Sequence, residues 1–117
     1  MNKISPSNSD AQAAAVRELN DRFRNTLAGG TVVLTAAVIA LGRAAQREII
    51  SQVRTFSDFN EANDPFGEHD FGAFTSAGER LFFKIDYFNL DMTAGSENPA
   101  DATITTRVLT IMCATDW

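Results

Sequence analysis

The last apolar stretch of the chain, residues 104–114, limits the fold more than any other segment. Over residues 108–113 apolar side chains occur at both odd and even positions, so a strand here is apolar on both faces. Such a strand needs cover on both sides, which favours a central place in a sheet sheltered by helices. The only cysteine, Cys113, lies in this run and is expected to be a small buried hydrophobic residue rather than a reactive thiol.

Three other segments have the alternation or composition of strands. Residues 80–88 alternate, and one face of that strand is expected to join the core; it carries Leu81, Phe83, Ile85 and Tyr87. Residues 71–75 precede it, and the four residues between them have the length and composition of a hairpin turn. Residues 31–35 form a short β-rich segment after two glycines.

The first half of the chain has helical spacing. Ser9 is expected to cap a helix that runs to about Leu27, with Asp10 in its first turn. The apolar stripe of this helix consists of Val16, Leu19, Phe23 and Leu27. The polar residues expected to point away from the core are Arg17, Asp21, Arg22 and Arg24. A second helix is expected over residues 43–55, after a break at Gly42.

The predicted order is therefore α-β-α-β-β-β, which indicates an α+β fold with two helices packed on one face of a small, mainly antiparallel sheet. We expect a flexible N-terminal tail at residues 1–8 and a single domain at residues 9–117. The tail lacks the features of a signal peptide, and the longest apolar run, residues 36–41, is far shorter than the roughly 20 residues of a membrane span. A cytoplasmic protein without membrane contact is expected.

Charge is distributed unevenly. Residues 1–54 contain seven Lys/Arg and four Asp/Glu, whereas residues 55–117 contain three and eleven, so the halves carry +3 and −8 within a net charge of −5. The acidic half repels phosphate backbones, so we expect no direct nucleic-acid binding and favour a partner with a basic surface or a cation. A solvated acidic face that only aids solubility is the alternative.

Residues 63–72 gather the only histidine, three carboxylates, two glycines and a proline. If the segment is extended, Glu68 and Asp70 share a face while His69 points away, so the three can hold one ion only if the backbone turns at Gly67. A single histidine makes a zinc site improbable and leaves a carboxylate-held Mg²⁺ or Ca²⁺ as the metal alternative. In the structural alternative, Asp64 caps a turn and His69 bonds a neighbouring carboxylate.

Catalysis is a second alternative for the same segment. His69 with a nearby carboxylate contains the parts of an acid–base pair, and Glu68, His69 and Asp70 are the candidate catalytic residues of a small metal-assisted hydrolase or transferase. No nucleophile motif or phosphate-binding loop accompanies them. Asp86 is expected to pair with Arg107 across strands, as a structural ion pair. The prediction is therefore a protein that needs no metal or other cofactor and is more readily explained as non-enzymatic.

The chain resembles a bacterial family catalogued as domain of unknown function 3768. The resemblance covers roughly residues 18–114, and it is carried by residues 20–24, 30–35, 53–56, 63–72, 83–87 and 106–112. It includes the sequence Gly-Glu-His-Asp-Phe-Gly at residues 67–72. The resemblance implies a small accessory protein of bacterial plasmids and other mobile elements, with no activity assigned.

These observations together predict a protein-binding role. More phenylalanines occur near the acidic residues than an alternating core requires, although a second small core under the loop would also explain them. The expected contact residues are Asp58, Glu61, Asp64, Phe66, Glu68, His69 and Asp70. We expect an acidic inhibitor of a host defence complex, of the anti-CRISPR or anti-restriction type, and the doubly apolar last strand leaves room for a homodimer through the sheet.

Overall fold

The computed structural model describes residues 8–117, so most of the predicted tail at residues 1–8 lies outside the described residues. In chain order the elements are α1 (Asn8–Thr26), β1 (Gly30–Leu34), α2 (Ala36–Ile39), α3 (Arg43–Thr55), β2 (Phe71–Ser76), β3 (Glu79–Phe88), β4 (Thr106–Cys113) and the 3₁₀ turn η1 (Ala114–Asp116). The predicted α+β class is confirmed.

The four strands form one sheet in the order β1-β4-β3-β2, so β4 lies inside the sheet as its apolar pattern predicts. β3 pairs with β2 and with β4 in antiparallel orientation, whereas β1 pairs with β4 in parallel. The sheet is therefore mixed, with two of its three pairings antiparallel. Ile111 of β4 lies between Leu34 of β1 and Phe83 of β3, which joins the two halves of the chain in one core.

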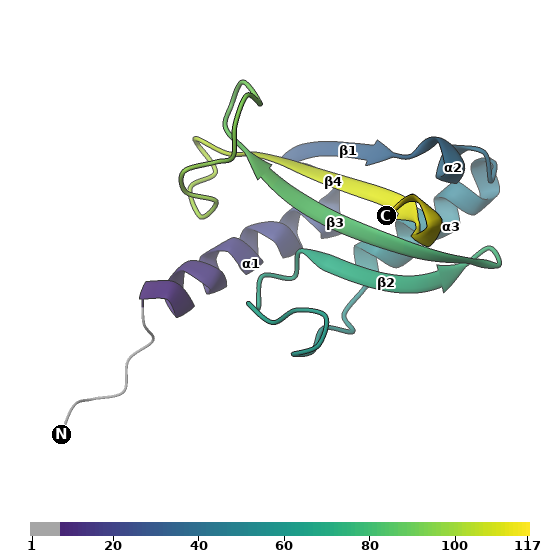
Figure 1. Ribbon diagram of the computed structural model, residues 1–117, viewed down its shortest axis with the longest axis horizontal. Coiled ribbons are helices and arrows are strands. Elements are labelled where there is room, and N and C mark those ends of the chain that lie inside the picture. The colour runs from purple at the N-terminus through teal and green to yellow at the C-terminus, as the bar shows by residue number, and fades with distance from the viewer. Residues whose placement is uncertain (1–7) are drawn as a thin grey trace.

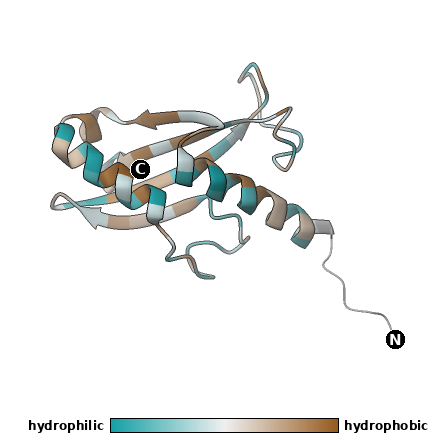
Figure 2. Ribbon diagram, turned by 180° about the vertical axis from the view of Figure 1, so that it is seen from behind, coloured by the Kyte–Doolittle hydropathy of each residue, from teal (hydrophilic) through white to brown (hydrophobic). Residues whose placement is uncertain are grey.

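Helices α1 and α3 lie across one face of the sheet, behind it in Figure 1 and in front in Figure 2. Ile49 and Val53 of α3 are fully buried against this face. The strands contribute Phe74, Leu81, Phe83, Ile85, Leu109, Ile111 and Cys113 to the same core. The predicted core face of β3 is confirmed, and Cys113 is buried as expected.

The two long helices pack on one face of the sheet, as predicted, so the second apolar face of β4 needs other cover. Neither α1 nor α3 reaches it, and the chain end covers part of it instead (Figure 1). Trp117 packs edge-on against Phe71 and Phe82, at centroid distances of 5.5 and 5.6 Å. The C-terminal turn therefore supplies part of the cover on the face that carries no long helix. The predicted homodimer through this sheet stays a prediction.

The N-terminal helix already includes Asn8, so Ser9 lies within its first turn together with Asp10 and is not the cap that the sequence predicted. The hairpin between β2 and β3 is confirmed: Ala77 and Gly78 form a two-residue turn with φ of 54° and 76°, the left-handed geometry that such turns require. Among the described residues, no helix has the length and apolar character of a membrane span.

Candidate functional site

The loop between α3 and β2, residues 56–70, contains all the predicted site residues; we call it the acidic loop. Asp64 fixes the conformation of this loop by accepting hydrogen bonds from its backbone. Its side chain is 5% exposed, and Oδ1 accepts hydrogen bonds from the backbone N–H groups of Glu68 (3.0 Å) and His69 (3.2 Å). A carboxylate that accepts two backbone bonds fixes a tight turn. The structure therefore places Asp64 in the capping role that one interpretation of the sequence assigned to it.

The backbone does turn at Gly67, whose φ is 69°, and again at His69, whose φ is 56°. A β-carbon at Gly67 would lie 3.3 Å from Nη1 of Arg17, so both conformation and space favour glycine there. The turn does not make the three candidate catalytic side chains converge. Glu68 Oε1 accepts a hydrogen bond from the Tyr87 hydroxyl, whereas His69 faces Asp21 of α1.

Helix α1 holds the acidic loop from behind. Arg17 Nη1 donates to the carbonyl of Gly67 at 2.8 Å, and Asn20 Nδ2 donates to the carbonyl of Glu68 at 3.0 Å. These bonds join segments nearly fifty residues apart and satisfy backbone carbonyls that a loop would otherwise leave to water. The loop is consequently fixed to the helix at two consecutive peptide groups.

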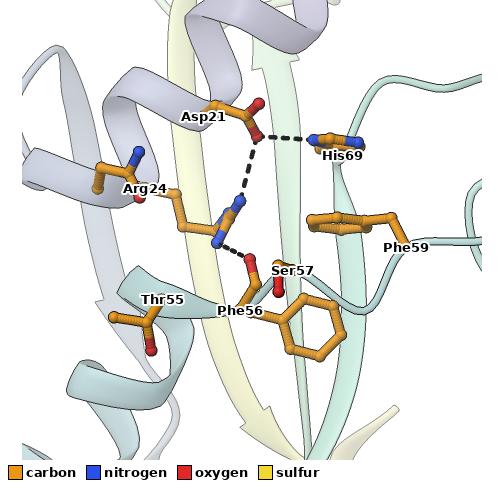
Figure 3. Close-up of a pocket in the computed structure, with 8 residues that line it drawn as sticks. Asp21, Arg24, Thr55, Phe56, Ser57, Phe59 and His69 are labelled. Atoms are coloured by element: carbon orange, nitrogen blue, oxygen red, sulfur yellow. Dashed lines mark hydrogen bonds and ion pairs between the residues drawn. The ribbon is translucent and has the colours of Figure 1, made fainter.

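His69 lies between two carboxylates. Its Nδ1 is 2.8 Å from Asp21 Oδ1, and its Nε2 is 3.7 Å from Asp64 Oδ2. The ring stacks on Phe59 with a centroid distance of 3.9 Å and an interplanar angle of 6° (Figure 3). An aspartate–histidine pair is the arrangement that orients a general base, but here the second ring nitrogen also faces a carboxylate. The geometry is that of a side chain holding the loop together.

Arg24, which the sequence placed on the solvent side of α1, is 3% exposed. Its Nη1 donates to the carbonyls of Val53 and Phe56, each at 2.8 Å, and its Nη2 donates to Asp21 at 3.1 Å. The prediction was wrong because this arginine caps the carbonyls at the C-terminal end of α3, a role that needs an inward-pointing cation. Burial lowers the pKa of Arg24, and the hydrogen bond with Asp21 opposes that effect.

A cavity of about 350 Å³ opens beside this group (Figure 3). It is lined by Asp21, Arg24, Asn25, Thr55, Phe56, Ser57, Phe59 and His69. Most of the arginine donors are already used by protein acceptors, which leaves the cavity without a free strong cation. The described residues also contain no group of three or more His, Cys, Asp and Glu side chains placed to hold a metal ion.

A second polar network lies behind Glu68. Asn20 Nδ2 donates to the Tyr87 hydroxyl at 2.8 Å, and Arg107 Nε donates to Asn20 Oδ1 at 2.8 Å. Burial raises the pKa of the Tyr87 hydroxyl well above its usual value. Burial also raises the pKa of Asp70, with the Glu68 carboxylate as the next cause.

The predicted ion pair between Asp86 and Arg107 is not formed. Asp86 pairs with Lys84 at 3.1 Å instead, because Arg107 lies on the helix-covered face of the sheet and Asp86 lies on the other face.

The outer side of the acidic loop carries the remaining predicted residues. Phe66 is 79% exposed, and Asp58 and Glu61 are also exposed. A hollow of about 350 Å³ lies next to Phe66, between Pro65 and the first turns of α1. The predicted site thus divides into an inner set that holds the loop, Asp64, Glu68 and His69, and an outer set, Asp58, Glu61 and Phe66. Asp70 belongs to neither set and is the last residue of the loop, directly before β2.

Sequence reasoning missed the supporting residues Asn20, Asp21, Arg24, Tyr87 and Arg107. Asn20, Asp21 and Arg24 lie on α1, where polar residues are normally solvent-exposed, and only the tertiary fold brings them against the loop. Tyr87 and Arg107 lie on β3 and β4, where the alternation predicts the face of a residue but not its hydrogen-bond partner.

Fold and site define a small α+β protein with an acidic loop fixed to its N-terminal helix. The chain belongs to the family described as Protein of unknown function (DUF3768), whose model matches residues 34–116. The resemblance inferred from the sequence is confirmed over this range, which contains the whole acidic loop but not α1. No curated protein and no solved structure matches the chain.

Proposed function

We propose that this protein is a non-enzymatic binding module that recognises a protein partner through the outer side of the acidic loop. The observation that carries the proposal is the exposure of Phe66, at 79%, on a loop that Arg17, Asn20 and Asp64 hold in place. Among the large apolar side chains of the described residues, Phe66 is the most exposed, and its backbone is already ordered.

Binding energy at protein interfaces is concentrated in a few residues, and aromatic side chains are enriched among them. An aromatic ring on a backbone that is already ordered loses little conformational entropy on binding. Phe66 meets both conditions, and the hollow beside it offers space for a side chain of the partner. The inner residues then contribute indirectly, by holding Phe66 in the geometry that binds.

The partner is expected to present a basic surface. Asp58 and Glu61 are exposed near Phe66, in a half of the chain with eleven acidic and three basic residues. Complementary charge accelerates association and selects the partner, while its effect on affinity is smaller. Direct binding to nucleic acid is disfavoured for the same reason.

We extend the proposal to the biological role that the family resemblance implies. On this proposal the protein is an accessory factor of a bacterial mobile element that acts in the cytoplasm and inhibits a host defence complex, such as a CRISPR effector or a restriction enzyme. Basic channels that bind nucleic acid in such complexes suit an acidic loop with a protruding aromatic ring.

The test is quantitative affinity capture from a bacterial host with matched variants. Phe66→Ala is compared with Leu90→Ala, which truncates another exposed apolar residue, 64% exposed, in a different loop. Asp58→Lys/Glu61→Lys is compared with Glu79→Lys/Glu97→Lys, which changes the net charge equally at exposed positions elsewhere.

A stoichiometric basic partner that is lost with Phe66→Ala and with the loop reversal, but kept by both controls, is the expected result. Phe66→Ala should weaken the purified complex at least about tenfold. A partner retained by both loop variants, or no partner at all, would contradict the proposal.

A further inference from the structure

Arg107 is a buried cation whose protein partners are all neutral. It is 3% exposed; its Nε donates to the side-chain oxygen of Asn20, and its Nη2 donates to the carbonyl of Pro99. None of the ion pairs among the described residues includes it. Buried charges in proteins are normally paired, so the missing carboxylate calls for an explanation.

The surroundings balance the charge only in part. Burial lowers the pKa of Arg107, while Tyr87 and then Glu68 act in the opposite direction. The guanidinium lies 5.2 Å from the ring centroid of Tyr87, and the Glu68 carboxylate lies beyond the hydroxyl of that ring. The Glu68 carboxylate is therefore separated from Arg107 by the Tyr87 side chain.

One end of the guanidinium is still available. Nη1 of Arg107 has no hydrogen-bond partner in the described part of the chain, and Arg24 Nε is the only side-chain atom there that is both unpartnered and sealed from solvent. Nη1 of Arg107 therefore keeps contact with solvent. The residue lines a cavity of about 190 Å³ between the end of α1 and the loop before β4.

The lining of this cavity combines apolar surface with a second cation. Leu19 and Phe23 of α1 contribute apolar surface to the lining, and Ala28 and Ala102 contribute small side chains. Arg22 lines the rim, where its mostly exposed side chain pairs with Glu18 at 3.0 Å. No acidic side chain lines the cavity.

We propose that this cavity binds an aliphatic carboxylate, with the carboxylate on Arg107 and Arg22 and the aliphatic part against Leu19 and Phe23. Guanidinium groups bind carboxylates through short charge-assisted hydrogen bonds, and Nη1 is free to make one. A phosphate fits less well, because the C-terminal end of α1 is close by and its partial negative charge opposes a dianion. The carboxylate belongs either to a small free acid or to the C-terminus of a polypeptide.

Titration of the ¹⁵N-labelled protein, followed by NMR, tests this assignment. The probes are butyrate, inorganic phosphate, and the peptide acetyl-Gly-Gly-Val as its free acid and as its amide. Ala102→Leu adds bulk to the cavity lining at a residue that is not a hydrogen-bond partner of Arg107, and Arg22→Gln removes the rim charge. Arg43→Gln, at the exposed start of α3, is the charge-matched control. An unchanged spectrum outside the cavity shows that each variant is folded.

Saturable butyrate binding that Ala102→Leu abolishes, Arg22→Gln weakens by roughly tenfold, and Arg43→Gln leaves unchanged is the expected result. Tighter binding of the peptide acid than of butyrate, with none of the amide, would assign the carboxylate to a chain end; equal or weaker binding of the peptide would assign it to a free acid. The proposal is overturned if no carboxylate binds saturably up to about 10 mM, if Ala102→Leu has no effect, or if phosphate binds and butyrate does not.

Discussion

The imidazole of His69 lies flat against the phenyl ring of Phe59, with centroids 3.9 Å and planes 6° apart. The two residues stand near opposite ends of the acidic loop, so the stack closes the loop on itself. Asp21 then joins this closed loop to α1 through its contact with His69 Nδ1. Phe66, between the two ends, is displayed by a loop that is fixed on both sides.

Replacement of His69 by Gln separates a structural role from a catalytic one. Glutamine can still donate to Asp21 but cannot stack on Phe59, so we expect a loss of about 1 kcal/mol in the free energy of unfolding. The affinity for a captured partner should change only a few-fold, because His69 lies behind the exposed surface.

Urea denaturation and titration of the complex measure the two effects. A double-mutant cycle with Phe59→Leu should assign most of the lost stability to the stack. An acid–base catalyst would instead lose nearly all its activity in His69→Gln, and that result would favour the enzyme alternative.

Replacement of Asp64 by Ala should be more costly than replacement by Asn. Alanine leaves the N–H groups of Glu68 and His69 without their acceptor, for an expected loss of about 1–3 kcal/mol in the free energy of unfolding. Asparagine keeps an oxygen in place and should lose less. Urea denaturation measures both, and equal losses for the two variants would contradict the capping role of Asp64.

Much of the fold could be predicted because local periodicity follows burial. The alternation in residues 80–88 and the spacing of Val16, Phe23 and their neighbours correctly identify core faces. The hairpin turn was also predictable, since a short segment with Gly78 joins two β-rich runs and glycine readily takes left-handed backbone angles. The parallel pairing of β1 with β4 was not, because strand partners about eighty residues apart leave no local signal.

Only the part of the site that lies in the acidic loop could be predicted from the sequence. A single segment of sequence contained Asp64, Phe66, Glu68 and His69, but the residues that give them their roles lie in α1. Asp21 and Arg24 look like solvent-facing helix residues until α1 packs beside α3 and the loop. The inward turn of Arg24 follows from the unsatisfied carbonyls at the end of α3, which depend on tertiary structure.

The raised pKa of Asp70 predicts a stability that depends on pH. Burial and the Glu68 carboxylate both favour the protonated form in the folded state, so the folded protein holds this proton to a higher pH than the unfolded chain. Ionised Asp70 therefore destabilises the fold above its folded-state pKa, and the penalty disappears below the ordinary value of 3.8. Asp70→Asn should accordingly raise the free energy of unfolding at pH 7.

The same substitution should have little effect near pH 3, where the carboxyl is protonated in both states. Urea denaturation at the two pH values checks this, with Asp58→Asn as an exposed control in the same loop. Destabilisation by Asp70→Asn at pH 7 would show that the carboxylate makes a favourable contact, against the assigned cause of its shift.

Replacement of Arg24 by Met tests whether the loop, α1 and α3 depend on one cation. Methionine keeps much of the buried side-chain volume but loses the bonds to Val53 and Phe56 and leaves Asp21 without its arginine. We expect a loss of about 3 kcal/mol in the free energy of unfolding, the size typical of a broken buried charge network.

Arg22→Met, at an exposed position two residues away, is the control and should change the free energy of unfolding by less than about 0.5 kcal/mol. Arg24→Lys should lie between them, because one ammonium keeps the charge but cannot reach two carbonyls and a carboxylate in the planar geometry of a guanidinium. Equal stabilities for Arg24→Met and Arg22→Met in urea would show that the buried cation does not hold these elements together.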